Sequence, residues 1–297
     1  RCNSRVGNVI MSNFSDFIGG GSASQINEVI SLNNDADTVT LADGRVYLRG
    51  GVLETDPNVY PNASTTTGYT GTSTNVSSQD ANPSGLTWDG THLWVCGNTT
   101  NAVYKYTAAG VYTGTSFSTS SQTTNPTDIA WDGTYLWVVG GTIVYKYNAA
   151  GVYQSVSFSV SGQESSPTAL TSDGTYLWVV GYGADKAFKY NTAGVYQNVS
   201  FSVIAKVPAA YGIEWDGTSF WVIDAVSDAV YKYNAAGVYQ GLNFSVAAQD
   251  TFPWGLAWTG SAFWVCGSAN DTIYKYGDVV GVTADTSFGA QNYVRVV

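Results

Sequence analysis

The side chains best suited to acid–base chemistry in this chain are acidic residues in loop-like segments. Two carboxyl groups facing each other across a pocket are the usual machinery of glycoside hydrolysis, with one acting as acid and the other as base or nucleophile. Five acids are candidates for such a pair: Asp80, Glu164, Asp185, Asp224 and Asp250. Sequence spacing does not give their separation in space, so a hydrolytic pair stays an alternative. Glu214 lies in an otherwise apolar strand and is either ligand-binding or water-bound.

Other catalytic chemistries find little support among the residue types. The 297 residues include one histidine, His92, and three cysteines without a Cys-x-x-Cys pair. The sequence has no Ser-His-Asp order, phosphate-binding glycine loop or zinc-ligand spacing. Cys96 and Cys266 are expected to be buried thiols, because equivalent positions on packed sheets lie about 10 Å apart, beyond disulfide reach. We therefore expect no catalytic residue, no metal and no cofactor.

Charge and composition exclude two classes of partner. The chain has 12 basic and 22 acidic residues, a formal net charge of −10, and is 14% aromatic. It therefore lacks the positive surface that attracts nucleic acid or anionic lipid. No run approaches the roughly 20 apolar residues that span a bilayer. So much aromatic surface requires a folded core. We expect no nucleic-acid binding and no membrane span.

A repeat organises the middle of the chain. Five related segments have their anchors at Trp88, Trp131, Ser172, Trp215 and Trp258, which are separated by 43, 41, 43 and 43 residues. A period of about 43 residues fits a four-stranded propeller blade. The sequence therefore predicts an all-β fold with a five-bladed β-propeller over residues 65–280.

Each repeat contains four short segments with a period of two, which is typical of strands. In the first repeat these are Gly85–Trp88, Leu93–Cys96, Tyr104–Tyr106 and a strand that ends at Phe117. An Asp-Gly turn joins the first two strands in four repeats and favours a tight hairpin. The acids of these turns are expected to be structural: Asp89, Asp132, Asp173 and Asp216. The fifth repeat has Thr259 at this position. The repeat tryptophans are expected to pack between blades.

Closure of the ring has two candidate strands. Gly68–Ser73 is similar to Val111–Ser116, the outer strand of the first repeat, although it precedes that repeat in the chain. As the outer strand of the fifth blade it would join both ends of the array. Asp285–Phe288 is the rival, and we favour the N-terminal strand.

One face of the propeller is expected to carry the segments that vary between repeats. The loops between the second and third strands and the crossovers between blades emerge on this face. Tyr211 and Trp254 depart from the repeat beside the crossovers, and Tyr182 lies in a variable loop. An aromatic platform near amides and carboxylates suits carbohydrate. The alternative is that these loops differ in sequence between repeats only because nothing constrains them. The candidate ligand-binding residues are Tyr182, Tyr211, Trp254, Asn98, Asn101, Asn125, Gln163, Asp185, Asp224, Asp228, Asp250 and Asn270.

The flanks, residues 1–64 and 281–297, differ from the repeats and contain all five arginines. Thr38–Arg49 predicts a hairpin, Asn292–Val296 one further strand, and Gly19–Ser22 a linker. We expect a small β-rich mounting module built from both ends of the chain.

The flanks also carry a resemblance to a protein class. Asp43–Asp56, followed by Tyr60-Pro61, and the terminal Gln291–Val296 resemble flanks of phage tail-fibre-type virion proteins with Trp-Asp-Gly-Thr repeats inserted between them. The resemblance implies a virion appendage that displays the propeller towards the host, with the flanks joining other virion proteins or forming a homo-oligomer. It offers no matched catalytic residues.

These observations together predict a non-enzymatic adhesin at the virion surface or another extracellular location. The propeller would bind a host cell-surface receptor, favoured as a glycan. The alternatives are a structural or decoration subunit of a virion or extracellular filament, and a polysaccharide depolymerase.

Overall fold

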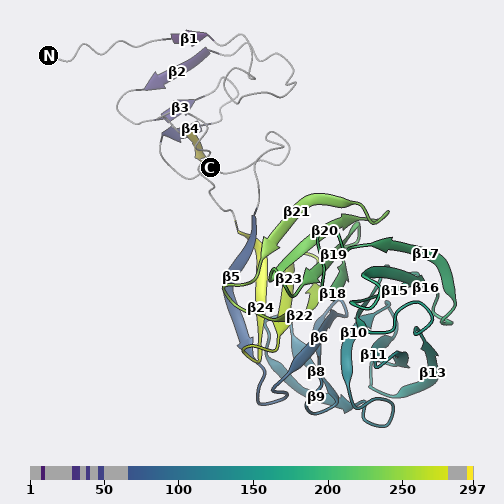
Figure 1. Ribbon diagram of the computed structural model, residues 1–297. Helices are drawn as coiled ribbons and strands as arrows, with labels where there is room; N and C mark the ends of the chain where they lie inside the picture. Colours follow the sequence, from purple (N-terminus) through teal and green to yellow (C-terminus); the bar gives the residue numbers. More distant parts are fainter. Residues whose placement is uncertain are drawn as a thin grey trace. The chain divides into compact units, whose positions relative to one another are not determined.

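Strand patterns dominate the part of the chain that the computed structural model describes, which is residues 8–10, 29–33, 38–40, 46–49, 66–279 and 293–296. The chain divides into two units, one formed by Thr67–Val279 and one formed by Arg1–Thr66 with Val280–Val297 (Figure 1). Within the described ranges every regular element is a strand. No helix long and apolar enough to cross a membrane occurs in them.

The smaller unit contains a five-stranded antiparallel sheet in the order β1-β2-β3-β4-β25. The predicted hairpin is confirmed, because β3 and β4 form an antiparallel pair in which Thr38 lies opposite Leu48 and Thr40 lies opposite Val46. The predicted C-terminal strand is also confirmed, since it pairs with β4. The strands are β1 (Asn8–Ile10), β2 (Val29–Asn33), β3 (Thr38–Thr40), β4 (Val46–Arg49) and β25 (Tyr293–Val296). Cys2 and the expected linker Gly19–Ser22 lie outside the described residues.

The larger unit is the predicted five-bladed β-propeller, with four antiparallel strands in each blade (Figure 1). From the innermost strand outward, blade 1 is β6 (Pro83–Trp88), β7 (His92–Gly97), β8 (Ala102–Thr107) and β9 (Tyr112–Ser118), and blade 2 is β10 (Pro126–Trp131), β11 (Leu136–Gly140), β12 (Ile143–Tyr147) and β13 (Tyr153–Ser159). Blade 3 is β14 (Pro167–Ser172), β15 (Leu177–Gly181), β16 (Lys186–Tyr190) and β17 (Tyr196–Ser202), and blade 4 is β18 (Ala210–Trp215), β19 (Ser219–Asp224), β20 (Ala229–Asn234) and β21 (Tyr239–Ser245). Blade 5 is β22 (Pro253–Trp258), β23 (Ala262–Gly267), β24 (Thr272–Val279) and β5 (Thr66–Asn75).

The ring closes through β5, the favoured one of the two candidate strands. It lies beside β24, and Thr70 Oγ1 donates to the carbonyl of Lys275 at 3.0 Å. Blade 1 has the equivalent bond from Thr113 Oγ1 to the carbonyl of Lys105 at 2.9 Å. Because β22 also packs against β6, both ends of the propeller segment are held in one closed ring. The rival strand, Asp285–Phe288, lies outside the described residues.

The core consists of apolar clusters between neighbouring blades. In one of them, Trp94 of blade 1 packs with Ile129 and Tyr147 of blade 2, and all three are at most 1% exposed. Large aromatic side chains contribute most of the buried area in such cores. The expected packing of the repeat tryptophans between blades is therefore confirmed.

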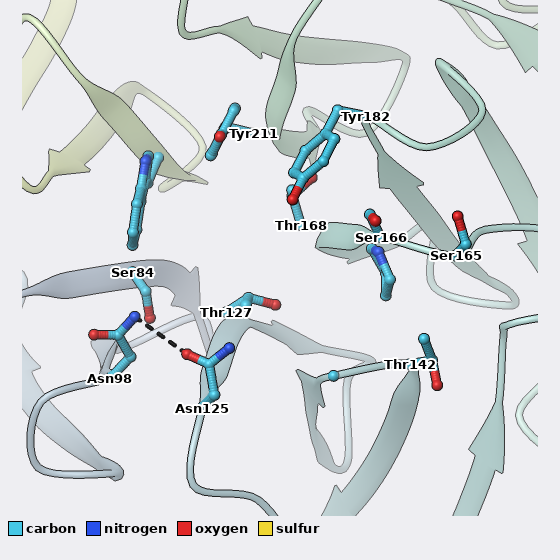
Figure 2. Close-up of a pocket in the computed structure, with 13 residues that line it drawn as sticks. Ser84, Asn98, Asn125, Thr127, Thr142, Ser165, Ser166, Thr168, Tyr182 and Tyr211 are labelled. Carbon is cyan, nitrogen blue, oxygen red and sulfur yellow. Dashed lines mark hydrogen bonds between the residues drawn. The ribbon is translucent and has the colours of Figure 1, made fainter.

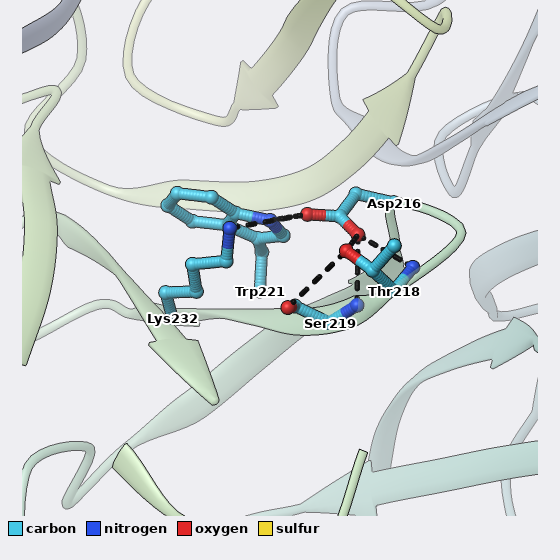
Figure 3. Close-up of polar contacts among 5 residues, drawn as sticks. All are labelled: Asp216, Thr218, Ser219, Trp221 and Lys232. Atoms are coloured by element: carbon cyan, nitrogen blue, oxygen red, sulfur yellow. Dashed lines mark hydrogen bonds and ion pairs between the residues drawn. The ribbon is translucent and has the colours of Figure 1, made fainter. Parts of the chain in front are cut away.

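A recurring polar contact ties the tight turn to the core in blades 1 to 4, as Figure 3 shows for blade 4. Asp216 accepts hydrogen bonds from the backbone N–H of Thr218 and Ser219 and, at 2.7 Å, from Trp221 Nε1. Lys232 Nζ lies 4.9 Å from the indole centroid and 3.6 Å from the Asp216 carboxylate. Burial alone would raise the pKa of Asp216, but the hydrogen bonds from Trp221, Thr218 and Ser219 outweigh burial and lower it.

The turn acids are structural, as predicted, because the same indole bond recurs at 2.7–2.8 Å in blades 1 to 4. Blade 5 has Thr259 instead, and its hydroxyl donates to the carbonyl of Ala262. The buried Trp264 Nε1 consequently has no hydrogen-bond partner within the described part of the chain. A buried donor without a partner costs about 1–3 kcal/mol.

We predict that Thr259→Asp raises the free energy of unfolding by about 1–2 kcal/mol, because it supplies the acceptor that Trp264 lacks. Urea denaturation followed by tryptophan fluorescence measures the change. Asp173→Thr is the matched control and should lower stability by a similar amount, since it removes the acceptor of Trp178. An unchanged or lowered stability of Thr259→Asp would contradict the structural role given to the turn acid.

Candidate functional site

The face that carries the variable segments contains an open pocket with a volume of about 350 Å³ (Figure 2). Its walls come from the starts of innermost strands, from crossovers and from loops after second strands, in all five blades. The lining residues are Ser84, Asn98, Asn125, Thr127, Gly141, Thr142, Ser165, Ser166, Pro167, Thr168, Tyr182, Tyr211 and Trp254.

One wall of the pocket is a row of aromatic rings from blades 3, 4 and 5. The rings of Tyr182 and Tyr211 are stacked with centroids 5.9 Å apart and planes 24° apart. Tyr211 and Trp254 are stacked at 5.9 Å and 19°. Phe252 packs edgewise on Tyr211 at 5.5 Å. Tyr182 is 52% exposed, so the row presents apolar surface to solvent.

An irregularity of the innermost strand explains why these rings reach the pocket. In blades 4 and 5 the register shifts between Ala210 and Gly212 and between Pro253 and Gly255, which leaves Tyr211 and Trp254 unpaired in the ladder. A bulged residue of this kind is re-aimed away from the regular alternation of the strand. The same shift occurs in blades 1, 2 and 3, where the bulged residues are Ser84, Thr127 and Thr168.

The opposite wall is polar and uncharged. Asn98 Nδ2 donates to Asn125 Oδ1 at 3.4 Å, the contact drawn in Figure 2. Ser84 Oγ and Thr168 Oγ1 donate to the carbonyls of Pro126 and Ala210 in the next blade. Both hydroxyl groups are buried, and these bonds tie the floor of the pocket to the next blade.

Sequence reasoning identified five of the lining residues: Asn98, Asn125, Tyr182, Tyr211 and Trp254. It missed the hydroxyl residues of the polar wall. Three of these, Ser84, Thr127 and Thr168, occupy the same repeat position as Tyr211 and Trp254, so alignment of that position could have found them.

The remaining candidates do not line this pocket, and several hold loop conformation instead. Asn101, Asp185 and Asp228 have φ values of 56°, 52° and 48°, in the left-handed region. Short polar side chains adopt this region more readily than other non-glycine residues. Gln163 Oε1 accepts the hydroxyl of Tyr190, and Asn270 Nδ2 donates to the carbonyl of Gln249.

Most of the loop acids proposed as a hydrolytic pair are buried and accept backbone N–H groups. Glu164 accepts hydrogen bonds from the N–H groups of Ser166, Gly183 and Ala184. Asp80 accepts the N–H of Thr100. Asp250 Oδ1 accepts the N–H of Phe252, whereas its buried Oδ2 has no partner among the described residues. Among the described residues that line the pocket there is no Asp or Glu. The hydrolytic alternative therefore gains no support from this pocket.

In blade 4 the acid that holds the loops lies at the end of the second strand and not in the crossover. In blades 1, 3 and 5 the second strand ends in a glycine, for example Gly181, whose missing side chain leaves room for the carboxyl group of Glu164. Blade 4 instead has Asp224 at the strand end and Val207 in the crossover. Asp224 accepts the N–H groups of Ala209 and Ser227 at 3.0 Å. This exchange gives Asp224 a structural explanation.

Two further acids brace the centre of the ring. Glu214 accepts bonds from Thr171 Oγ1 at 2.9 Å and from the N–H of Trp258 at 3.0 Å, which connects blades 3, 4 and 5. The ligand or water that the sequence suggested for Glu214 is therefore replaced by donors from neighbouring blades. Asp128 is 2% exposed and accepts the N–H of Leu170 in blade 3 at 2.9 Å.

Burial controls the protonation of both central acids. Desolvation raises the pKa of Glu214 to about 8 and exceeds the lowering by its hydrogen bonds from Trp258 and Thr171. Desolvation likewise raises the pKa of Asp128 well above its usual value, and the nearby Glu214 adds to the rise. Burial therefore shifts the protonation equilibrium of both carboxyl groups toward the neutral form.

The described residues offer no cluster of three or more His, Cys, Asp or Glu side chains that could hold one metal ion. Cys96 and Cys266 are buried free thiols, as expected from their equivalent positions in adjacent blades. Desolvation raises the pKa of both thiols, so neither has the thiolate character that nucleophilic chemistry needs.

Comparison with known proteins supports the fold alone. No protein-family model matches the sequence, and no curated protein sequence matches it. Glutaminyl cyclase from Myxococcus xanthus is structurally similar, with a TM-score of 0.52 and 12% identity over 73% of this chain and 94% of its own. Virginiamycin B lyase from Staphylococcus aureus aligns with a TM-score of 0.43 and 15% identity over 84% of this chain and 77% of its own. At 12% identity the similarity to the glutaminyl cyclase shows a shared fold and nothing beyond the fold.

We predict that Glu214→Gln flattens the dependence of stability on pH. Between about pH 4.5 and pH 8 the unfolded chain loses the Glu214 proton while the folded chain keeps it. The free energy of unfolding therefore falls as pH rises through this window, by at most about 1.4 kcal/mol per pH unit for one group. Thermal unfolding of both proteins from pH 4 to pH 9 measures the difference. Parallel profiles would contradict a protonated Glu214.

Proposed function

We propose that the propeller is a non-enzymatic receptor-binding module of a virion appendage, and that it binds a cell-surface glycan in the pocket of the variable face. The observation that carries the binding proposal is the pairing of a stacked row, Tyr182, Tyr211 and Trp254, with an uncharged wall of hydroxyl and amide groups (Figure 2).

The chemistry of the two walls fits the two sides of a sugar. Aromatic faces carry a negative quadrupole and attract the C–H faces of a pyranose ring. Hydroxyl and amide groups of the pocket supply both donors and acceptors for the hydroxyl groups of the sugar. A pocket with a large apolar wall and a few convergent polar groups is the usual form of a small-molecule site.

The same pocket favours binding over hydrolysis. Glycoside hydrolysis requires two carboxyl groups beside the scissile bond, and the described lining has none. The loop acids Asp80, Glu164 and Asp224 are committed to backbone N–H groups, and Asp250 is buried outside the pocket lining. This arrangement supports an adhesin over a depolymerase.

The virion setting of the proposal rests on the flanks. Asp43–Asp56 and Gln291–Val296 resemble flanks of tail-fibre-type proteins, which favours attachment to other virion proteins, a homo-oligomer and an extracellular location. Strand β25 pairs with β4, so both flanks contribute to one five-stranded sheet, as a mounting module would require.

We predict that the full chain binds saturably to a glycan array or to host cells, and that Tyr211→Ala/Trp254→Ala weakens binding at least about 30-fold, as expected for loss of about 2 kcal/mol from central aromatic contacts. Val152→Ala/Val195→Ala is the matched control, because both valines are exposed in turns of the opposite face. It should bind as the wild type does. No binding of the folded wild-type chain to any glycan or cell would overturn the adhesin and favour a structural subunit.

A further inference from the structure

We infer that the pocket selects uncharged sugars and that Asn125 is the residue that orients them, an inference that rests on the proposed glycan-binding function. Three observations carry it: the charge of the lining, the arrangement of the aromatic row, and a chain of amide hydrogen bonds that ends at Asn125.

The lining opposes charged ligands. Within the described residues the pocket wall contains no Asp, Glu, Lys, Arg or His. Residues 67–279 contain seven lysines against 14 acidic residues, a net charge of −7. A carboxylated sugar would lose hydration in the pocket without meeting a counter-charge, and the field of the propeller would repel it.

The arrangement of the rings also separates sugars from cations. A quaternary ammonium ion is held best by rings that surround it from several sides. Here the planes of Tyr182, Tyr211 and Trp254 differ by only 24° and 19° between neighbours, so the rings form a row and not a cage. A row along one wall suits a flat ligand with an apolar face. The volume of about 350 Å³ lies near the lower end of the 300–1,000 Å³ of small-molecule sites and favours one or two sugar units.

The polar wall contains a row of three amide groups. Asn82 Nδ2 donates to Asn98 Oδ1 at 2.7 Å, and Asn98 Nδ2 donates to Asn125 Oδ1 at 3.4 Å. Each amide has one oxygen acceptor and one NH₂ donor, so in this arrangement the NH₂ group of Asn125 takes no part in the row. The Asn125 oxygen is occupied by Asn98, and its nitrogen faces the pocket interior (Figure 2).

The backbone holds Asn125 in place for this role. Its N–H donates to Thr123 Oγ1 at 3.2 Å, at the point where the crossover enters β10. The side chain thus presents an NH₂ donor opposite the aromatic row. Its partner in a sugar is an oxygen acceptor, either a hydroxyl or the carbonyl of an acetamido group.

The test uses sugar pairs that differ only at C6, where the uronate has a carboxylate in place of the hydroxymethyl group, together with an acetamido sugar and a quaternary ammonium ion. We would titrate the full chain with glucose and glucuronate, galactose and galacturonate, N-acetylglucosamine, and choline, at 50 and 500 mM NaCl, and follow binding by NMR. The expected result is binding of at least one neutral sugar, with affinity unchanged by salt, and at least about tenfold weaker binding of its uronate. Equal or tighter binding of a uronate, or saturable binding of choline, would overturn the inference.

Variants of Asn125 test the orienting role. Asn125→Ala removes the donor and Asn125→Asp replaces it with an acceptor, and each should weaken the neutral sugar at least about tenfold. Asn270→Ala is the matched control, an exposed amide of a variable loop that is absent from the pocket lining. It should leave the affinity unchanged, and thermal unfolding should show that all three variants are folded.

The outcomes separate this inference from the proposed function. If the chain binds cells or glycans but prefers acidic sugars, or binds with the same affinity when Asn125 is changed, the inference fails and the adhesin stands. If the folded chain binds no sugar, glycan or cell, both fail. If the wild type and the Asn270→Ala control bind a neutral sugar and only the Asn125 variants lose this binding, both the inference and the proposed function are supported.

Discussion

The structure depends on one constraint, which is that every blade must cover its apolar faces with its two neighbours. A single four-stranded sheet with large residues on both faces has no stable form in water, so the array is stable only when the ring closes. Strand β5 meets this requirement by completing blade 5 from the other end of the propeller segment. Trp94, buried between blades 1 and 2, is one of the large aromatic side chains that fill these seams.

This constraint separates the parts of each repeat that are fixed from those that are free to vary. The turn acids, such as Asp216, and the central acids Asp128 and Glu214 connect strands within and between blades. The bulged second residue of each innermost strand is free of the ladder, and it reaches the pocket face. A hydroxyl residue stands at this position in blades 1 to 3 and an aromatic residue stands there in blades 4 and 5, which makes the pocket asymmetric although the fold repeats.

Sequence reasoning recovered the features that follow from local patterns. The spacing of Trp88 and its equivalents gave the number of blades, the Asp-Gly turns gave the hairpins, and Gly68–Ser73 gave the closing strand, because each depends on neighbouring residues in the chain. It did not distinguish pocket residues from loop-bracing ones such as Asp224, whose role depends on the distant Ala209 backbone and on Val207 in the crossover. Nor did it assign a role to Ser84, because its repeat position was noticed only where it carries the aromatic residues Tyr211 and Trp254.

The central claim is that ligand binds at the aromatic row, and fluorine NMR tests it most directly. All ten tryptophans lie in the propeller, so 5-fluorotryptophan labelling of the full chain reports on the turns, the core and the pocket together. The Trp254 resonance can be assigned with a Trp254→Phe variant, and the chain is then titrated with a glycan that it binds. The account predicts a saturable shift of the Trp254 resonance while those of the buried Trp94 and Trp137 stay in place. A shift confined to other tryptophans, or no shift at saturating glycan, would contradict it.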